Sequence, residues 1–171
     1  MFGARLQTAY SPHSQLAALG TAALFVVASV RLWILSRADT SHVYPDWRQG
    51  FVRARMSSEG SLAFNTFCNI VTTATWRSLD VRALYCSLLG RQEASILQTT
   101  ALLQQGYGLA AEATLCSWCP PAAARLAIEP ARAFALALRS RHLWMSFRYP
   151  DPPTERQHPD PCEALASTRI H

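Results

Sequence analysis

The sequence predicts a mostly α-helical protein: a small helical bundle with a membrane-anchor-like helix at its N-terminus and a disordered, proline-rich tail at its C-terminus. Two observations support this prediction. The chain of 171 residues is 50% hydrophobic and only 16% charged, which excludes extended disorder, because disordered chains are polar and highly charged. Its apolar residues also fall in long stretches bounded by proline, glycine or charged residues, as the helices of a bundle do. The length suffices for one domain with its own core.

The first of these stretches is the apolar run Leu16–Val30, which continues past Arg31 to Leu35. A membrane-spanning helix needs about 20 mostly apolar residues, and an arginine near its end can reach the headgroups. We therefore expect a membrane anchor, as a single span or the first of several. Three alternatives stay open. They are a cleaved secretory signal, a mitochondrial presequence, since the first 38 residues contain arginine and no acid, and the buried helix of a soluble core.

Uncharged segments make up the middle of the chain. Pro45, Gly50 and Gly60 indicate loops around a short helix. The segment Gly60–Trp76 then fits a buried helix, a pair of strands, or a polar membrane helix that faces other protein. Ala94–Ala111 is also uncharged, but its glutamines argue against contact with lipid. It predicts a buried helix that ends near the glycines of this segment.

Two amphipathic segments complete the predicted bundle. The segment Arg77–Gln92 predicts a helix, because apolar residues recur in it at helical spacing: Leu79, Ala83, Cys86 and Leu89. The segment Ala122–Arg148 follows the break at Pro120-Pro121 and predicts a helix, kinked at Pro130, with arginines along one face. Such a face fits a membrane surface or an ordinary helix that packs on the domain and turns its arginines to solvent.

The sequence pattern divides the chain into three regions. Residues 1–37 form the anchor or targeting segment, and residues 38–149 form the helical domain. Residues 150–171 contain five prolines among alternating acids and no apolar periodicity. This composition is typical of a disordered, extended tail.

Arginine supplies all of the formally charged basic side chains. All sixteen basic residues are arginine, and the net charge is +5. The absence of lysine excludes Schiff-base chemistry on a lysine side chain. The arginines alternate with alanine and leucine rather than with aromatic residues and glycine, so we expect no nucleic acid partner. A membrane, and a protein partner beside it, are the partners we expect.

The sharpest local motif is Cys116-Ser117-Trp118-Cys119. A zinc site needs two further ligands at suitable spacing, and no second pair of cysteines or histidines occurs, so we expect no metal. Cys116 and Cys119 are candidates for a redox pair. However, Cys116 is expected near the C-terminal end of a helix, where the helix dipole opposes ionisation of a thiol. The alternative is a pair of apolar thiols in a packed turn.

Two carboxylates are candidates for acid–base catalysis. Glu112 closes an uncharged run, and Asp80 lies within an amphipathic one. Burial raises the pKa of a carboxyl group, as a general acid requires. Asp80 has Arg77 three residues before it as a potential ion-pair partner, whereas Glu112 has no arginine within one helical turn.

No catalytic motif or nucleotide-binding loop is present, and no cofactor is expected. We therefore expect a small membrane-associated accessory or interaction protein. One alternative is a membrane-embedded enzyme that acts on a lipophilic substrate through a buried carboxylate. Another is a mitochondrial helical protein with a cleaved presequence. A third is a poorly constrained reading frame without an evolved fold.

Overall fold

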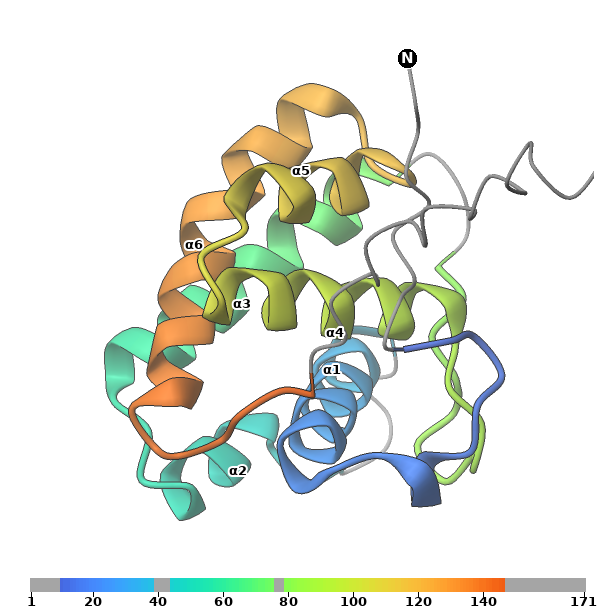
Figure 1. Cartoon of the computed structure of the whole chain (residues 1–171). Coiled ribbons are helices and arrows are strands. Elements are labelled where there is room, and N and C mark those ends of the chain that lie inside the picture. Colours follow the sequence, from blue (N-terminus) through green and yellow to red (C-terminus); the bar gives the residue numbers. More distant parts are fainter. Residues whose placement is uncertain (1–9, 39–43, 76–78, 147–171) are drawn as a thin grey trace, which may run out of the picture. The chain divides into compact units, whose positions relative to one another are not determined.

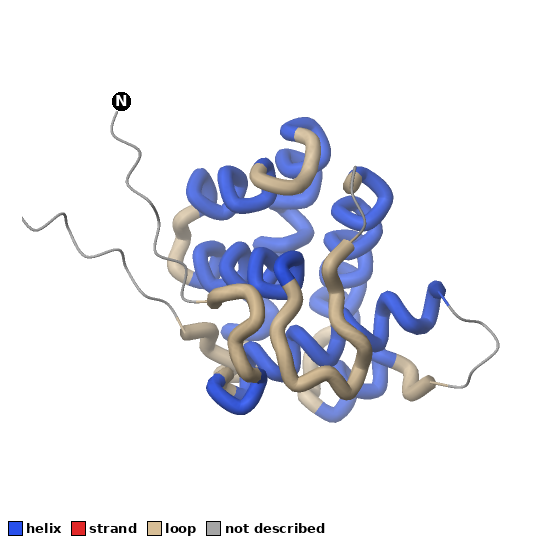
Figure 2. Tube along the Cα trace, turned by 90° about the vertical axis from the view of Figure 1, so that its right-hand side faces the viewer, coloured by secondary structure: helices blue, strands red, loops and turns tan. Residues whose placement is uncertain are grey.

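Helix α4 (Arg91–Gln104) is the central helix of the bundle, and nearly all of its side chains are buried. In the computed structural model, which describes residues 10–38, 44–75 and 79–146, α4 contacts α1 (Thr21–Ala38), α5 (Gly108–Cys116) and α6 (Pro121–Arg139). Figure 1 shows α4 crossing between α1 and α5. The mostly α-helical class is confirmed, and no strand occurs in the part of the chain that the structure describes (Figure 2).

Helices α3 (Ser58–Ala74) and α6 make the most extensive helix–helix contact in the bundle. Gly60 allows the two helices to approach, because a Cβ atom at this position would lie only 2.7 Å from the Cβ atom of Ala137. The rings of Phe64 and Phe134 pack with their centroids 5.0 Å apart. Phe51, from the short helix α2 (Trp47–Arg53), lies 5.1 Å from Phe64. We call this contact between α2, α3 and α6 the apolar junction.

Helix α1 is long and apolar enough to cross a membrane, by length and composition. A helix in the core of a soluble protein and a signal sequence can have the same length and composition. Its side chains are buried on several sides, among them Val26, Val30 and Trp33. Arg31 is also buried, so in this bundle its side chain does not reach outward from the helix end.

The expected helix over Arg77–Gln92 is wrong for the residues that the structure describes. Residues 79–90 form a loop with a single turn, and α4 begins only at Arg91. The reason is that backbone carbonyl groups of this loop bind a side chain of α1. The carbonyl oxygens of Leu84, Cys86 and Leu88 accept hydrogen bonds from Arg31. A helix would have consumed these carbonyls internally.

The other segments follow the sequence pattern closely. The uncharged run that starts at Gly60 is helical as far as Ala74, within α3. Helix α2 is the short helix expected before it, and the Asp46 carboxylate caps it by accepting from the Arg48 N–H. Within the segment Ala122–Arg148, helix α6 ends at Arg139, and the described residues that follow it, 140–146, are not helical. Pro121 occupies the first turn of α6, where its missing N–H is harmless. The predicted tail, residues 150–171, lies outside the described residues.

Candidate functional site

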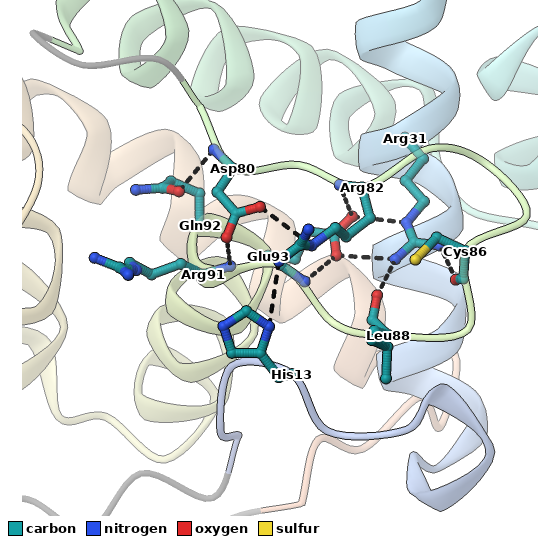
Figure 3. A network of polar contacts seen from close by, with 10 residues as sticks. His13, Arg31, Asp80, Arg82, Cys86, Leu88, Arg91, Gln92 and Glu93 are labelled. Carbon is teal, nitrogen blue, oxygen red and sulfur yellow. Dashed lines mark hydrogen bonds and ion pairs between the residues drawn. The ribbon is translucent and has the colours of Figure 1, made fainter.

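Arg31 and Glu93 form a buried ion pair between α1 and α4 (Figure 3). The Arg31 Nε donates to Glu93 Oε1 at 2.7 Å, and its Nη2 donates to Oε2 at 3.0 Å. Their side chains are 1% and 0% exposed. A parallel pair of hydrogen bonds fixes both the distance and the orientation of a guanidinium and a carboxylate. The pair therefore determines how α1 lies against α4.

The loop before α4 saturates the remaining donors of Arg31. Its Nη1 donates to the carbonyl oxygens of Cys86 at 2.6 Å and Leu84 at 3.3 Å, and its Nη2 donates to that of Leu88 at 2.8 Å. A guanidinium has five N–H donors, and Arg31 uses all of them. We call Arg31, Glu93 and the surrounding loop of residues 79–90 the polar junction.

Glu93 also caps the first turn of α4. Its Oε2 accepts from the Gly90 N–H at 2.6 Å, and its Oε1 accepts from the Arg82 N–H at 3.3 Å. The segment before α1 closes the outer side of the loop, because Leu16 donates its N–H to the carbonyl oxygen of Ser87 at 2.8 Å. The charged groups of Arg31 and Glu93 are thus fully engaged in contacts within the protein.

Asp80, one of the two predicted acid–base residues, lies half-buried at the rim of the polar junction. Its Oδ2 accepts from the Arg91 N–H at 3.0 Å, and its Oδ1 lies 3.2 Å from the Nε of Arg82. Arg77, the partner expected from the sequence, lies outside the described residues. Asp80 therefore ties the loop to the start of α4, and its observed contacts are those of a structural residue.

Glu112, the other predicted acid–base residue, lies half-buried on α5. Among the described residues it has no hydrogen bond or ion pair, and no contact joins it to Asp80. The structure therefore does not bring the two carboxylates together as an acid–base pair. A catalytic role for either residue stays a prediction.

Cys116 and Cys119 differ in their surroundings. Cys116 is exposed at the last residue of α5, whereas Cys119 is buried, and both thiols are free. Burial raises the pKa of the Cys119 thiol, and the neighbouring Thr75 hydroxyl, 3.9 Å from Sγ, offsets part of this effect. A raised pKa lowers the fraction of thiolate, which is the reactive form in redox exchange. The surroundings of Cys119 thus oppose the redox role.

Gln104, at the end of α4, is a second buried polar link. Its amide group donates to the carbonyl oxygen of Leu143 at 2.9 Å, and its Oε1 accepts from the Met145 N–H at 2.8 Å. Its own carbonyl oxygen accepts from Arg139 at 3.3 Å. The segment that follows α6 is thereby fastened to the central helix.

Sequence reasoning missed Glu93 and Gln104 as key residues. A signal for Glu93 was present, since a lone arginine inside an apolar run requires a buried acid when the helix folds into a core. Glu93 also stands three residues after Gly90 at the start of an uncharged run, which is the spacing of a capping residue. Within the described ranges, no three histidine, cysteine or acidic side chains come together as a metal would require.

One end of the bundle carries a group of exposed arginines. We call this group the basic end, and it consists of Arg48, Arg53 and Arg55 around α2 together with Arg139 and Arg141 at the end of α6. A shallow hollow of about 400 Å³ lies at α2, lined by Asp46, Arg48, Gln49, Val52 and Arg53.

The comparisons with known proteins add no identification. No family model, curated protein or solved structure matches the chain. The function must therefore be argued from the residues and their geometry.

Proposed function

We propose that this chain is a non-catalytic, membrane-associated accessory protein that acts by binding. The observation that carries this proposal is the basic end, where five arginines, four of them without an ion pair to any residue that the structure describes, stand beside exposed apolar side chains. Anionic lipids attract such arginines, and tryptophan beside them suits the membrane interface. The interior supports the non-catalytic part, because its buried charges are engaged in structural contacts.

The proposed association is peripheral, with α1 kept inside the bundle. If α1 crossed a bilayer alone, Arg31 would lose its five hydrogen bonds, and Glu93 would be left buried without a counter-charge. Breaking a buried ion pair in this way costs about 3–5 kcal/mol. The arginine would then also face the cost of lying in hydrocarbon. The same contacts disfavour cleavage of α1 as a signal or presequence.

Membrane fractionation with a C-terminal tag tests this proposal. We expect full-length protein in the membrane pellet at low salt, and its release by high salt or alkaline carbonate, because salt screens attraction between charges. Protein in the supernatant at low salt would overturn membrane association. Protein that stays in the pellet after carbonate would show α1 inserted and overturn the peripheral mode. A product shortened by about 35 residues would identify a removed targeting segment instead.

The alternative of a membrane-embedded enzyme depends on Glu112, the half-buried carboxylate that has no hydrogen bond or ion pair among the described residues. A Glu112→Gln variant separates the two functions. Under our proposal this variant keeps both its membrane fractionation and its stability. A loss of a measurable conversion of lipid by the purified protein, with folding intact, would favour the enzyme.

A further inference from the structure

We infer that the basic end is a binding surface for anionic phospholipid headgroups. This inference rests on the proposed function and deepens it, because it names the surface and the lipid class. The elements that build this surface are α2, the turn that follows α2, and the end of α6.

Contacts in the apolar junction hold α2 and the end of α6 at the same end of the bundle (Figure 1). The rings of Phe51 on α2 and Phe134 on α6 lie 6.1 Å apart. One turn further along α6, Ala137 lies against Gly60, and Gly60 lies near Met56 of the turn after α2. The two elements therefore lie at the same end of the bundle, although they are far apart in the sequence, and we take their exposed side chains together as one face.

The charge on this face is positive and largely uncompensated. Within the described ranges, Arg53, Arg55, Arg139 and Arg141 form no ion pair with an acidic side chain. Arg48 does so, with its Nη1 3.5 Å from Asp46, but it also lies over the ring of Trp47 at 4.5 Å. Among the residues that the structure describes, the acidic side chains near these arginines are Asp46 and Glu59. Five arginines against two acids leave a net positive face.

The apolar side chains on the same face suit the interface of a bilayer. Val52 is 74% exposed and Trp144 is 52% exposed. The guanidinium of Arg139 lies 5.2 Å from the ring of Trp144, so the tryptophan stands within the basic group. Tryptophan is enriched where hydrocarbon meets headgroups. The combination fits a lipid surface better than a purely polar acidic partner.

The hollow at α2 offers a place for a phosphate group. Arg48 and Arg53 line it together with Gln49, the exposed Val52 and Asp46, whose carboxylate lies 3.5 Å from Arg48 Nη1. Arginine binds phosphate oxygens with two parallel hydrogen bonds and loses little hydration in doing so. We therefore expect a lipid phosphate to enter between these two arginines while Val52 contacts the upper acyl region.

Binding to vesicles tests the inference with matched charge variants. The purified full-length chain is titrated with vesicles of phosphatidylserine and phosphatidylcholine, and with vesicles of phosphatidylcholine alone. The test variant is Arg53→Gln/Arg141→Gln, and the control is Arg91→Gln/Arg125→Gln. Both remove two charges from exposed arginines that form no ion pair with the residues that the structure describes. Arg91 begins α4, and Arg125 lies in the first half of α6, so the control charges lie away from the basic end.

We expect the wild-type chain to bind the anionic vesicles and not the neutral ones. The test variant should bind about 30-fold more weakly, because each arginine at an anionic surface contributes about a fivefold gain in partitioning. The control variant should change binding by less than about threefold, through net charge alone. Trp144→Ala should weaken binding further without changing its salt dependence.

Four results would overturn the inference. Equal weakening by the two double variants would show that net charge matters and the surface does not. Unchanged binding by the test variant would place the lipid site elsewhere, with the proposed function intact. Equal binding to neutral vesicles would show that binding does not depend on an anionic headgroup. Absence of binding to vesicles, with capture of an acidic polypeptide or of RNA instead, would assign this face to another partner. If membrane fractionation is also negative, the proposed function fails with it.

Discussion

The polar junction and the apolar junction hold the same bundle together by opposite means. In the polar junction, one guanidinium joins α1 to α4 and to three carbonyl oxygens of a loop that has no helix or strand of its own. In the apolar junction, rings and small residues of α2, α3 and α6 interlock without any charge, as at Phe64, Phe134 and Gly60.

This difference assigns different tasks to the two regions. Ring packing stabilises the fold in proportion to the area it buries, and it tolerates small shifts. A buried ion pair gains little net free energy, since desolvation of the two charges offsets their attraction. However, any arrangement that separates the two charges leaves one of them buried without a counter-charge, which is strongly destabilising. We therefore assign stability mainly to the apolar junction, and the position of α1 and of the loop of residues 79–90 mainly to the polar one.

The largest effect is expected from breaking the polar junction on one side. Arg31→Ala should lower the free energy of unfolding by about 4 kcal/mol, because it leaves the Glu93 carboxylate buried and unpaired. The double variant Arg31→Met/Glu93→Leu should recover about half of this loss, since no buried charge remains, although the loop carbonyls still lack their donor. Urea denaturation of the three proteins measures both values.

The exposed pair of Arg132 and Glu129, with 3.4 Å between Nε and Oε1, is the matched control for this measurement. Arg132→Ala should cost less than about 1 kcal/mol, as exposed pairs do. A loss below 1 kcal/mol for Arg31→Ala, equal to that of the control, would show that α1 is not held by the buried pair. If the wild-type chain does not unfold cooperatively, the alternative of a poorly constrained reading frame without an evolved fold is favoured.

The apolar junction should respond in the opposite way to a double substitution. Phe64→Ala should cost about 3 kcal/mol, through lost burial and the cavity left behind. Adding Phe134→Ala should cost more, never less, because no penalty is relieved when the second ring is removed. Leu62→Ala, on the same helix but 65% exposed, should change stability by less than about 0.5 kcal/mol. A double variant more stable than Phe64→Ala alone would remove the contrast between the two junctions.

The sequence was sufficient to predict most helices, for reasons that lie in local patterns. Uncharged runs located α3 and α4, and the proline pair located the start of α6. The prediction of a helix over residues 77–92 was wrong because the local spacing of apolar residues carries no information about hydrogen bonds to distant segments of the chain. The carbonyl oxygens of Leu84, Cys86 and Leu88 bind Arg31, which lies more than fifty residues earlier.

The candidate site was much less predictable than the fold. Glu112 and Asp80 were selected for charge near an apolar run, but the fully buried carboxylate is Glu93, whose importance depends on its pairing with Arg31. The basic end was equally hidden, because α2 and the end of α6 are joined only by tertiary contacts. Distances between segments that are remote in sequence are the information that a single sequence lacks.

The smallest effect concerns three turns that end helices in the left-handed region. In each turn, an N–H donates back to a carbonyl oxygen five residues earlier, for example Tyr107 to Leu102 at 2.9 Å. Gly106 occupies the left-handed position of this turn, with φ of 86°. Arg55 and His142 occupy the equivalent positions of the other two turns, with φ of 53° and 58°. A side chain in this region costs about 1–2 kcal/mol, whereas glycine costs about 0.5–1 kcal/mol in backbone entropy.

Arg55→Gly and His142→Gly should therefore each raise the free energy of unfolding by about 0.5–1 kcal/mol, and Gly106→Ala should lower it by about 1 kcal/mol. Urea denaturation of the three single variants checks these signs. Arg55 sharpens the contrast, because it also belongs to the basic end. Arg55→Gly should be more stable than the wild-type chain and yet bind anionic vesicles about fivefold more weakly. Loss of stability in Arg55→Gly would mean that the arginine side chain supports the turn by more than its left-handed backbone costs.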